Sequence, residues 1–243
     1  MTAETNSVFL LAFGAHPDDV EISAGGTIAK HIQAGQEVAL VDLTRGELGT
    51  RGTAETRDQE AKEAAELLGI KDRINLNLGD GFFEHNRENL IAVVKCIRYF
   101  RPQVVLANAL HDRHPDHAKG AKLVADACFL AGLPKIETFW DGVAQEAWRP
   151  RNLFHYIQDR YIKPDFAIDV TEFVITKFEA LKCYKTQFYD PNSTEPQTPI
   201  SGKSFFDFLE ARMRDMGREL QVDFAEGFST NRLIGIDNFN DLQ

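Results

Sequence analysis

The sequence predicts an α/β fold, a Rossmann-like and mostly parallel sheet with helices on both faces, in a single domain over residues 1–243 with a less regular carboxyl-terminal part. Three observations predict it. Short apolar runs alternate with helical patterns through the first half of the chain. Each run has the length of a buried strand. The 243 residues include 43% hydrophobic and 26% charged residues, the mixture of an ordinary globular domain.

Parallel strands are expected in the amino-terminal half because a helix separates each strand from the next. We expect strands over residues 8–15, 37–44, 74–78 and 103–108. We expect helices from about residue 23 to 35, 54 to 68, 88 to 100 and 115 to 131. The first three end at Gly35, at Gly69 and before Pro102, where helices commonly stop.

The carboxyl-terminal half has a weaker pattern. Strands are expected over residues 152–158 and 166–170, and helices over residues 171–184 and 204–220. Residues 186–203, between those helices, are rich in proline, serine, threonine and asparagine. A surface loop explains this segment slightly better than an ordered flap over a cleft.

Charge and cysteine content exclude several classes of partner. With 27 basic and 37 acidic side chains the formal net charge is −10, and phosphate-backbone binding needs a basic face, so we expect no nucleic-acid partner. No stretch approaches the ~18 apolar residues of a membrane span, and no signal peptide is visible, so we expect no membrane partner and a cytoplasmic location. Cys96, Cys128 and Cys183 fit buried thiols in a reducing compartment.

Two His-Pro-Asp motifs each follow a predicted strand. HPDD covers residues 16–19 and HPDH covers residues 114–117. In an open α/β sheet the loops after parallel strands gather along one edge, so the two motifs can meet in space. Two histidines and one carboxylate suffice for a catalytic zinc site whose fourth position is left to water. One motif alone could be a turn whose aspartate caps a helix; the two together favour a metal site.

These residues resemble the LmbE-like or PIG-L deacetylases, a family that includes enzymes acting on N-acetylglucosaminyl conjugates in mycothiol and bacillithiol synthesis. The segment AHPDDVEISAGGTIAK is similar to the family's amino-terminal signature, residues 44–49 to its T-x-G-E-x-G segment, and HPDH to its second metal motif. The runs ELGTRGTAETRDQEA, DRHPDH and LKCYKTQF are most similar to the bacillithiol-type deacetylases, which act on N-acetylglucosaminyl malate.

The resemblance implies a zinc ion bound by His16, Asp19 and His117, with Asp18 as the general base. Zinc can lower the pKa of bound water to about 7 and polarise an amide carbonyl, while an adjacent carboxylate accepts the proton. Another divalent ion such as Fe²⁺ could replace zinc, because the ligands restrict the metal's identity only in part.

The resemblance assigns His114 to stabilising the oxyanion or protonating the departing amine, held in tautomer and orientation by Asp116. An ionised aspartate beside a histidine raises the pKa of the imidazole, which suits a general acid near neutral pH. The alternative is that His114 only supports the metal ligands and transfers no proton.

Arg57 matches the family's arginine in the segment after the second strand, where a guanidinium would hold a substrate hydroxyl, a carboxylate or Asp116. From the residues alone, a solvated pair with Glu60 on a helix face explains Arg57 equally well. The resemblance favours the first interpretation.

Further cationic residues are expected near the cleft if the substrate carries malate carboxylates. Arg113, Arg51 and Lys185 are the candidate substrate-binding residues, although each also fits an ordinary solvent-facing charge.

Other functions fit parts of this pattern. Two histidines and a carboxylate also form the triad of non-haem Fe(II) oxygenases, but alternating strands and helices argue against that scaffold. A non-catalytic sugar-binding module would need neither Asp18 nor His114. A chitooligosaccharide or mycothiol-type substrate is the alternative within the deacetylase interpretation. The resemblance also leads us to expect a homo-oligomer.

Overall fold

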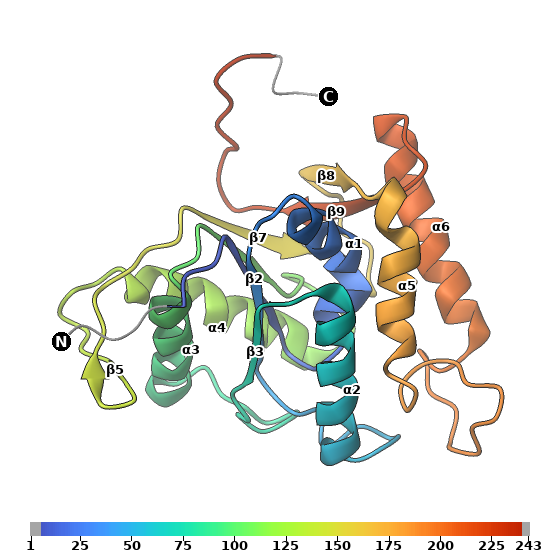
Figure 1. Cartoon of the computed structure of the whole chain (residues 1–243), viewed down its shortest axis with the longest axis horizontal. Coiled ribbons are helices and arrows are strands. Elements are labelled where there is room, and N and C mark those ends of the chain that lie inside the picture. The colour runs from blue at the N-terminus through green and yellow to red at the C-terminus, as the bar shows by residue number, and fades with distance from the viewer. Residues whose placement is uncertain (1–5, 240–243) are drawn as a thin grey trace.

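The central sheet has the strand order β3-β2-β1-β4-β7-β9-β8 in the computed structural model, which describes residues 6–239 (Figure 1). Strands β1 to β4 and β7 run parallel, whereas β9 pairs antiparallel with both β7 and β8. The strands are β1 (Leu10–Gly14), β2 (Val38–Asp42), β3 (Asp72–Asn75), β4 (Val104–Ala107), β7 (Asn152–Tyr156), β8 (Phe166–Asp169) and β9 (Ala225–Ser229). A separate hairpin comprises β5 (Phe139–Trp140) and β6 (Val143–Ala144).

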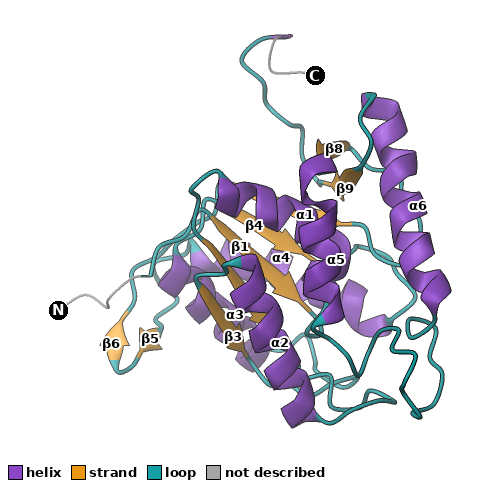
Figure 2. Ribbon diagram, turned by 45° about the vertical axis from the view of Figure 1, so that its right-hand side comes forward, coloured by secondary structure: helices purple, strands orange, loops and turns teal. Residues whose placement is uncertain are grey.

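Helices cover the sheet in two groups, α3 with α4 and α1 with α2 and α5, as Figures 1 and 2 show. Helix α6 packs against β8 and β9. The helices are α1 (Asp19–Gln33), α2 (Ala54–Leu68), α3 (Arg87–Phe100), α4 (Pro115–Ala131), α5 (Val174–Lys182) and α6 (Lys203–Leu220), with a 3₁₀ turn η1 (Thr171–Phe173) before α5.

The side chains of β1 explain why both faces need helices. Successive residues of a strand point to opposite faces, and every residue of β1 is buried. Leu11 and Phe13 belong to the cluster that contains the apolar residues of α3 and α4. Leu10 and Ala12 belong to the cluster that contains those of α1. The continuous apolar run therefore builds two cores, one on each side of the sheet.

Strand β1 marks the point where the strand order reverses. The chain moves from β1 outward to β2 and β3, then returns to place β4 on the other side of β1. Ligands of open α/β sheets bind in the crevice beside such a reversal, at the carboxyl ends of the strands. The loops that follow β1 and β4 carry the HPDD and HPDH motifs, so the topology brings both motifs to this crevice.

The predicted fold class, a mostly parallel sheet with helices on both faces, is confirmed. Several details differ. Helix α1 begins at Asp19 rather than near residue 23, β3 spans Asp72–Asn75 rather than residues 74–78, and α5 spans Val174–Lys182 rather than residues 171–184. Strand β9 and the β5-β6 hairpin were not expected. Within residues 6–239, no helix has the length and apolarity needed to cross a membrane.

Candidate metal centre and active site

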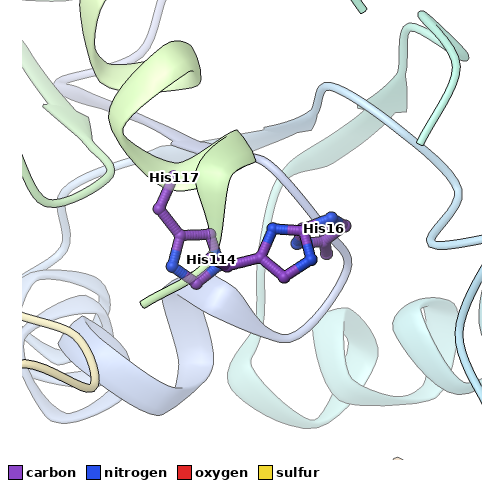
Figure 3. Close-up of side chains that lie close together, drawn as sticks. All are labelled: His16, His114 and His117. Carbon is purple, nitrogen blue, oxygen red and sulfur yellow. The ribbon is translucent and has the colours of Figure 1, made fainter. Parts of the chain in front are cut away.

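Three imidazole rings meet where the start of α4 faces the loop after β1 (Figure 3). The ring centroids of His16 and His114 are 4.6 Å apart, and that of His117 lies 5.6 Å from His16 and 5.2 Å from His114. Pro115 opens α4, a position where its missing N–H breaks no helical hydrogen bond. Helix α4 therefore presents His117 from its first turn.

The three side chains implied as metal ligands lie together. Asp19 Oδ1 is 3.2 Å from His117 Nε2, and Asp19 Oδ2 is 3.7 Å from His16 Nδ1. Asp19 thus approaches the two histidines through different oxygens. Among the described residues, the groups whose single ligand atoms all lie within 4.8 Å of one another are His16 with His114 and His117, and His16 with Asp80 and Asp116. His16 belongs to every set, so any metal bound here would use the loop after β1.

Asp19 is fixed by amides from two neighbouring strand ends. Asn108, after β4, donates to Asp19 Oδ2 at 2.9 Å, and Gln158, after β7, donates to Asp19 Oδ1 at 3.0 Å. The backbone N–H of His16 also donates to Asp19 Oδ2, at 2.9 Å. The sequence analysis did not identify either amide. The one feature of the sequence that could have pointed to Asn108 and Gln158 is that each follows a strand ending at this crevice.

His16 and His117 each have a second carboxylate partner. His117 Nδ1 lies 2.5 Å from Asp112 Oδ2, and His16 Nε2 lies 2.9 Å from Asp80 Oδ1. The T-x-G-E-x-G segment holds Asp80, since Leu48 N–H donates to its carboxylate and Glu47 accepts from its backbone N–H. Carboxylates behind ligating histidines set the orientation of the ring. The T-x-G-E-x-G segment therefore supports the Asp80 carboxylate that contacts His16.

The centre attracts positive charge. Burial opposes protonation of His16 and His117, yet their carboxylate neighbours raise the pKa of His16 well above its usual value and that of His117 to about 9. Asp19 contributes to both shifts, and its own pKa is lowered by the His117 charge despite its burial. Imidazole nitrogen and carboxylate oxygen are ordinary donors for zinc. The donor set therefore fits a divalent cation.

Asp18 has a different environment from its neighbour. Its φ of 112° lies in a region that non-glycine residues rarely adopt, and such strain persists where the surroundings enforce it. Asp18 lines the cavity, and its carboxylate accepts a hydrogen bond from Arg57 Nη2 at 3.2 Å. Burial raises the pKa of Asp18 to about 7, although the Arg57 charge acts in the opposite direction. Asp18 thus pairs with Arg57, whereas Asp19 contacts the two histidines.

Arg57 bonds to the protein rather than standing free for a substrate. Its Nη2 also donates to the carbonyl of Pro17, at 2.5 Å. It pairs with neither Asp116 nor Glu60 among the described residues; the Glu60 carboxylate accepts instead from Thr186. Arg57 still lines the cavity, and its hydrogen bonds connect it to the loop that carries Asp18.

His114 is not held by the Asp116 carboxylate as expected. The backbone N–H of Asp116 donates to His114 Nδ1 at 3.3 Å, whereas the carboxylate accepts from Gly81 N–H at 2.7 Å and Lys119 Nζ at 2.8 Å. The Asp116 charge does raise the pKa of His114 as expected, but the net shift is downward. Burial lowers this pKa, and the charges of His16 and His117 lower it further.

A cavity of about 340 Å³ opens over these groups, within the size range of small-molecule sites. Arg113 lines it and pairs through Nε with Asp159 at 2.9 Å. Arg51 and Lys185 are not among its lining residues: Arg51 bonds to Ser193 and Glu195, and Lys185 is exposed. Residues Gln187 and Ile200 bring the segment 186–203 to the cavity wall.

Comparison with known proteins is consistent with this geometry. Residues 11–128, which contain both His-Pro-Asp motifs, match the PIG-L family model described as GlcNAc-PI de-N-acetylase. A diacetylchitobiose deacetylase of Thermococcus kodakarensis is 32% identical over 74% of this chain and 70% of its own length. The chain belongs to the PIG-L family.

Two further relatives cover still more of this PIG-L chain. A probable N-acetyl-α-D-glucosaminyl L-malate deacetylase of Bacillus anthracis is 31% identical over 75% of this chain and 83% of its own length. The crystal structure of a conserved protein of Thermus thermophilus is 32% identical, covers 95% of this chain and 98% of its own, and superposes with a TM-score of 0.84. The family model and the Thermococcus relative support a hydrolase of the deacetylase type.

Proposed function

We propose that this PIG-L family member is a zinc-dependent N-deacetylase that hydrolyses the acetamide of an N-acetylglucosaminyl conjugate, releasing acetate and the free amine. We further propose N-acetylglucosaminyl malate as the substrate. The observation that carries the proposal is the convergence of the two His-Pro-Asp loops, with Asp19 3.2 Å from His117 and Asp18 at the cavity beside them. The Bacillus anthracis relative and the bacillithiol-type sequence runs support malate.

His16, Asp19 and His117 would hold the zinc ion, and Asn108 and Gln158 would keep the Asp19 oxygens in place. When bound, zinc supplies a polarised amide carbonyl and a water of lowered pKa. Another divalent ion such as Fe²⁺ could take its place with the same ligands.

Asp18 is the proposed general base. Its carboxylate lies at the cavity next to the metal ligands, and the hydrogen bond from Arg57 Nη2 directs one of its oxygens. A carboxylate within hydrogen-bond reach of the attacking water can accept its proton. The Asp18 side chain is buried as well as hydrogen-bonded, which limits its freedom to turn away.

His114 is the proposed group that stabilises the oxyanion; protonating the departing amine would need the imidazolium form, in which Nδ1 could not accept the Asp116 backbone N–H. His114 Nδ1 accepts the Asp116 backbone N–H, so the neutral ring carries its proton on Nε2, and the ring lines the cavity. An Nε2–H can donate to developing negative charge on the substrate. The Asp116 carboxylate accepts hydrogen bonds from Lys119 and Gly81 and does not hold the His114 ring.

Acetate release from three substrates tests the proposal. Purified protein would be analysed for bound metal and then assayed with N-acetylglucosaminyl malate, free N-acetylglucosamine and diacetylchitobiose. We expect zinc-dependent acetate release, with the malate conjugate preferred. Equal use of the free sugar would exclude the malate assignment, and a preference for diacetylchitobiose would favour the function of the Thermococcus relative.

A further inference from the structure

Helix α6 contributes four side chains to the wall of the cavity. Phe205, Phe208, Leu209 and Arg212 of this helix all line the cavity. The first three present an apolar surface, so Arg212 is the cation that α6 adds to it. The Arg212 guanidinium lies 5.2 Å from the Phe208 ring centroid, which limits its orientation.

One nitrogen of Arg212 lacks a hydrogen-bond partner. Its Nη1 is covered by other atoms yet forms no hydrogen bond within the described part of the chain. Polar atoms so placed are rare, because an unpaired buried donor loses its hydration without compensation. Burial lowers the pKa of Arg212 to about 10, so the guanidinium is still charged at neutral pH. The cavity wall therefore holds a charged donor that no described acceptor satisfies.

Nearby carboxylates do not neutralise this charge. Glu226, Asp159 and Asp112 attract Arg212 electrostatically. Each is engaged more closely elsewhere: Glu226 with Lys177 at 2.6 Å, Asp159 with Arg113 at 2.9 Å, and Asp112 with His117 at 2.5 Å. None is within ion-pair distance of Arg212 in residues 6–239. A bound anion is the partner that this arrangement lacks.

We propose that Arg212 is a specificity-determining residue which binds a carboxylate of the substrate's aglycone. The proposal rests on the proposed deacetylase function and names the feature by which the site distinguishes an acidic glycoside from a neutral one. A carboxylate suits a guanidinium because two parallel N–H···O bonds match its planar geometry. The sequence analysis placed this role on Arg113, Arg51 and Lys185; the cavity lining adds Arg212.

Arg212→Gln tests the proposal, with Arg214→Gln as the matched control. Arg214 lies on the same helix but is exposed and pairs with Glu210. Zinc-loaded wild type and both variants would be assayed on N-acetylglucosaminyl malate and on methyl N-acetylglucosaminide, which lacks a carboxylate. We expect Arg212→Gln to raise KM for the malate conjugate roughly tenfold or more, without an equal effect on the methyl glycoside. Arg214→Gln should change neither.

Binding supplies a readout that does not depend on turnover. Calorimetric titration with the deacetylated product glucosaminyl malate, and with methyl glucosaminide, should show the same selective loss in Arg212→Gln. If wild type releases acetate from neither glycoside, the proposed function fails, and the titration alone decides the role of Arg212. Equal losses for both ligands, or no loss for the malate ligand, would overturn the carboxylate assignment.

Arg212→Lys covers the case in which Arg212→Gln does not fold. Lysine keeps the charge but lacks the planar pair of donors, so we expect weaker selectivity for the malate ligand than in wild type. Unchanged selectivity in a folded Arg212→Lys protein would contradict bidentate carboxylate binding.

Discussion

Asp112 and His117 form the shortest contact of the candidate metal centre between a carboxylate and a histidine among the described residues, with 2.5 Å between Oδ2 and Nδ1. The other Asp112 oxygen accepts the backbone N–H of Arg160 at 2.7 Å, so the carboxylate is anchored on both sides. With the Nδ1 proton directed at Asp112, His117 presents Nε2 toward Asp19, and a bound metal would take the Nε2 lone pair in place of a proton. Asp112 therefore fixes the orientation of the His117 ring, so that Nε2 is available to bind a metal.

Asp112→Asn should weaken zinc binding by about 10- to 100-fold, the usual effect of removing a carboxylate behind a ligating histidine. Competition with a chromophoric chelator measures the affinity. Asp126→Asn is the matched control, because Asp126 lies 2.8 Å from His85 on the surface. An unchanged affinity in Asp112→Asn would show that Asp112 does not act through His117.

Asp18 and Asp19 should respond differently to substitution. Asp18→Ala should retain zinc and lose turnover by roughly 10²- to 10⁴-fold, since it removes only the proposed base. Asp19→Ala and His117→Ala should lose the metal. Metal content and acetate release would be measured on the same preparations. Loss of zinc from Asp18→Ala would reverse the proposed roles of the two aspartates.

Gly26→Ala should destabilise the fold. A Cβ at Gly26 would lie 2.8 Å from Val170 Cβ, so α1 packs closely here only because the side chain is absent. Overpacking costs about 1–3 kcal/mol, which exceeds the helix-propensity gain of at most about 1 kcal/mol. Urea unfolding measures the difference. Gly235→Ala, whose Cβ would meet nothing within 4 Å, should not be destabilising. A Gly26→Ala protein more stable than wild type would show that a Cβ at this position is not crowded by Val170.

Lys177→Met should be among the most destabilising single changes. Lys177 Nζ lies 2.6 Å from Glu226 Oε1, and both side chains are 1% exposed. Removing one partner of a buried pair costs about 3–5 kcal/mol because the other charge is left uncompensated. Urea unfolding would compare it with Lys182→Met, which breaks an exposed pair with Glu179 worth at most about 1 kcal/mol. Similar losses in the two variants would contradict this account.

Local sequence patterns predicted the parallel half of the fold well. Apolar runs and helix-ending glycines reflect short-range physics, and β1, β2, β4 and α2 lie where those signals placed them. Strand β9 was missed because its segment AEGFS has few apolar residues and contains both Glu226 and Gly227. The burial of Glu226 is explained only by its contacts with Lys177 and α1, which lie far away in sequence.

The candidate site was predictable only where a motif carried it. His16, Asp19 and His117 lie in the two His-Pro-Asp segments and do converge. Asp80 and Gln158 have no motif of their own, and their use depends on which strand ends meet. Arg212 lies in a helix with many charges, where a single cation cannot be distinguished from the exposed ones without its surroundings.

Anomalous diffraction at the zinc edge, from crystals of zinc-loaded protein, tests the central claim most directly. The account predicts one strong peak held by His16, Asp19 and His117, at the cavity that Asp18 lines. A peak held instead by His16, Asp80 and Asp116, or no peak at this centre, would contradict it.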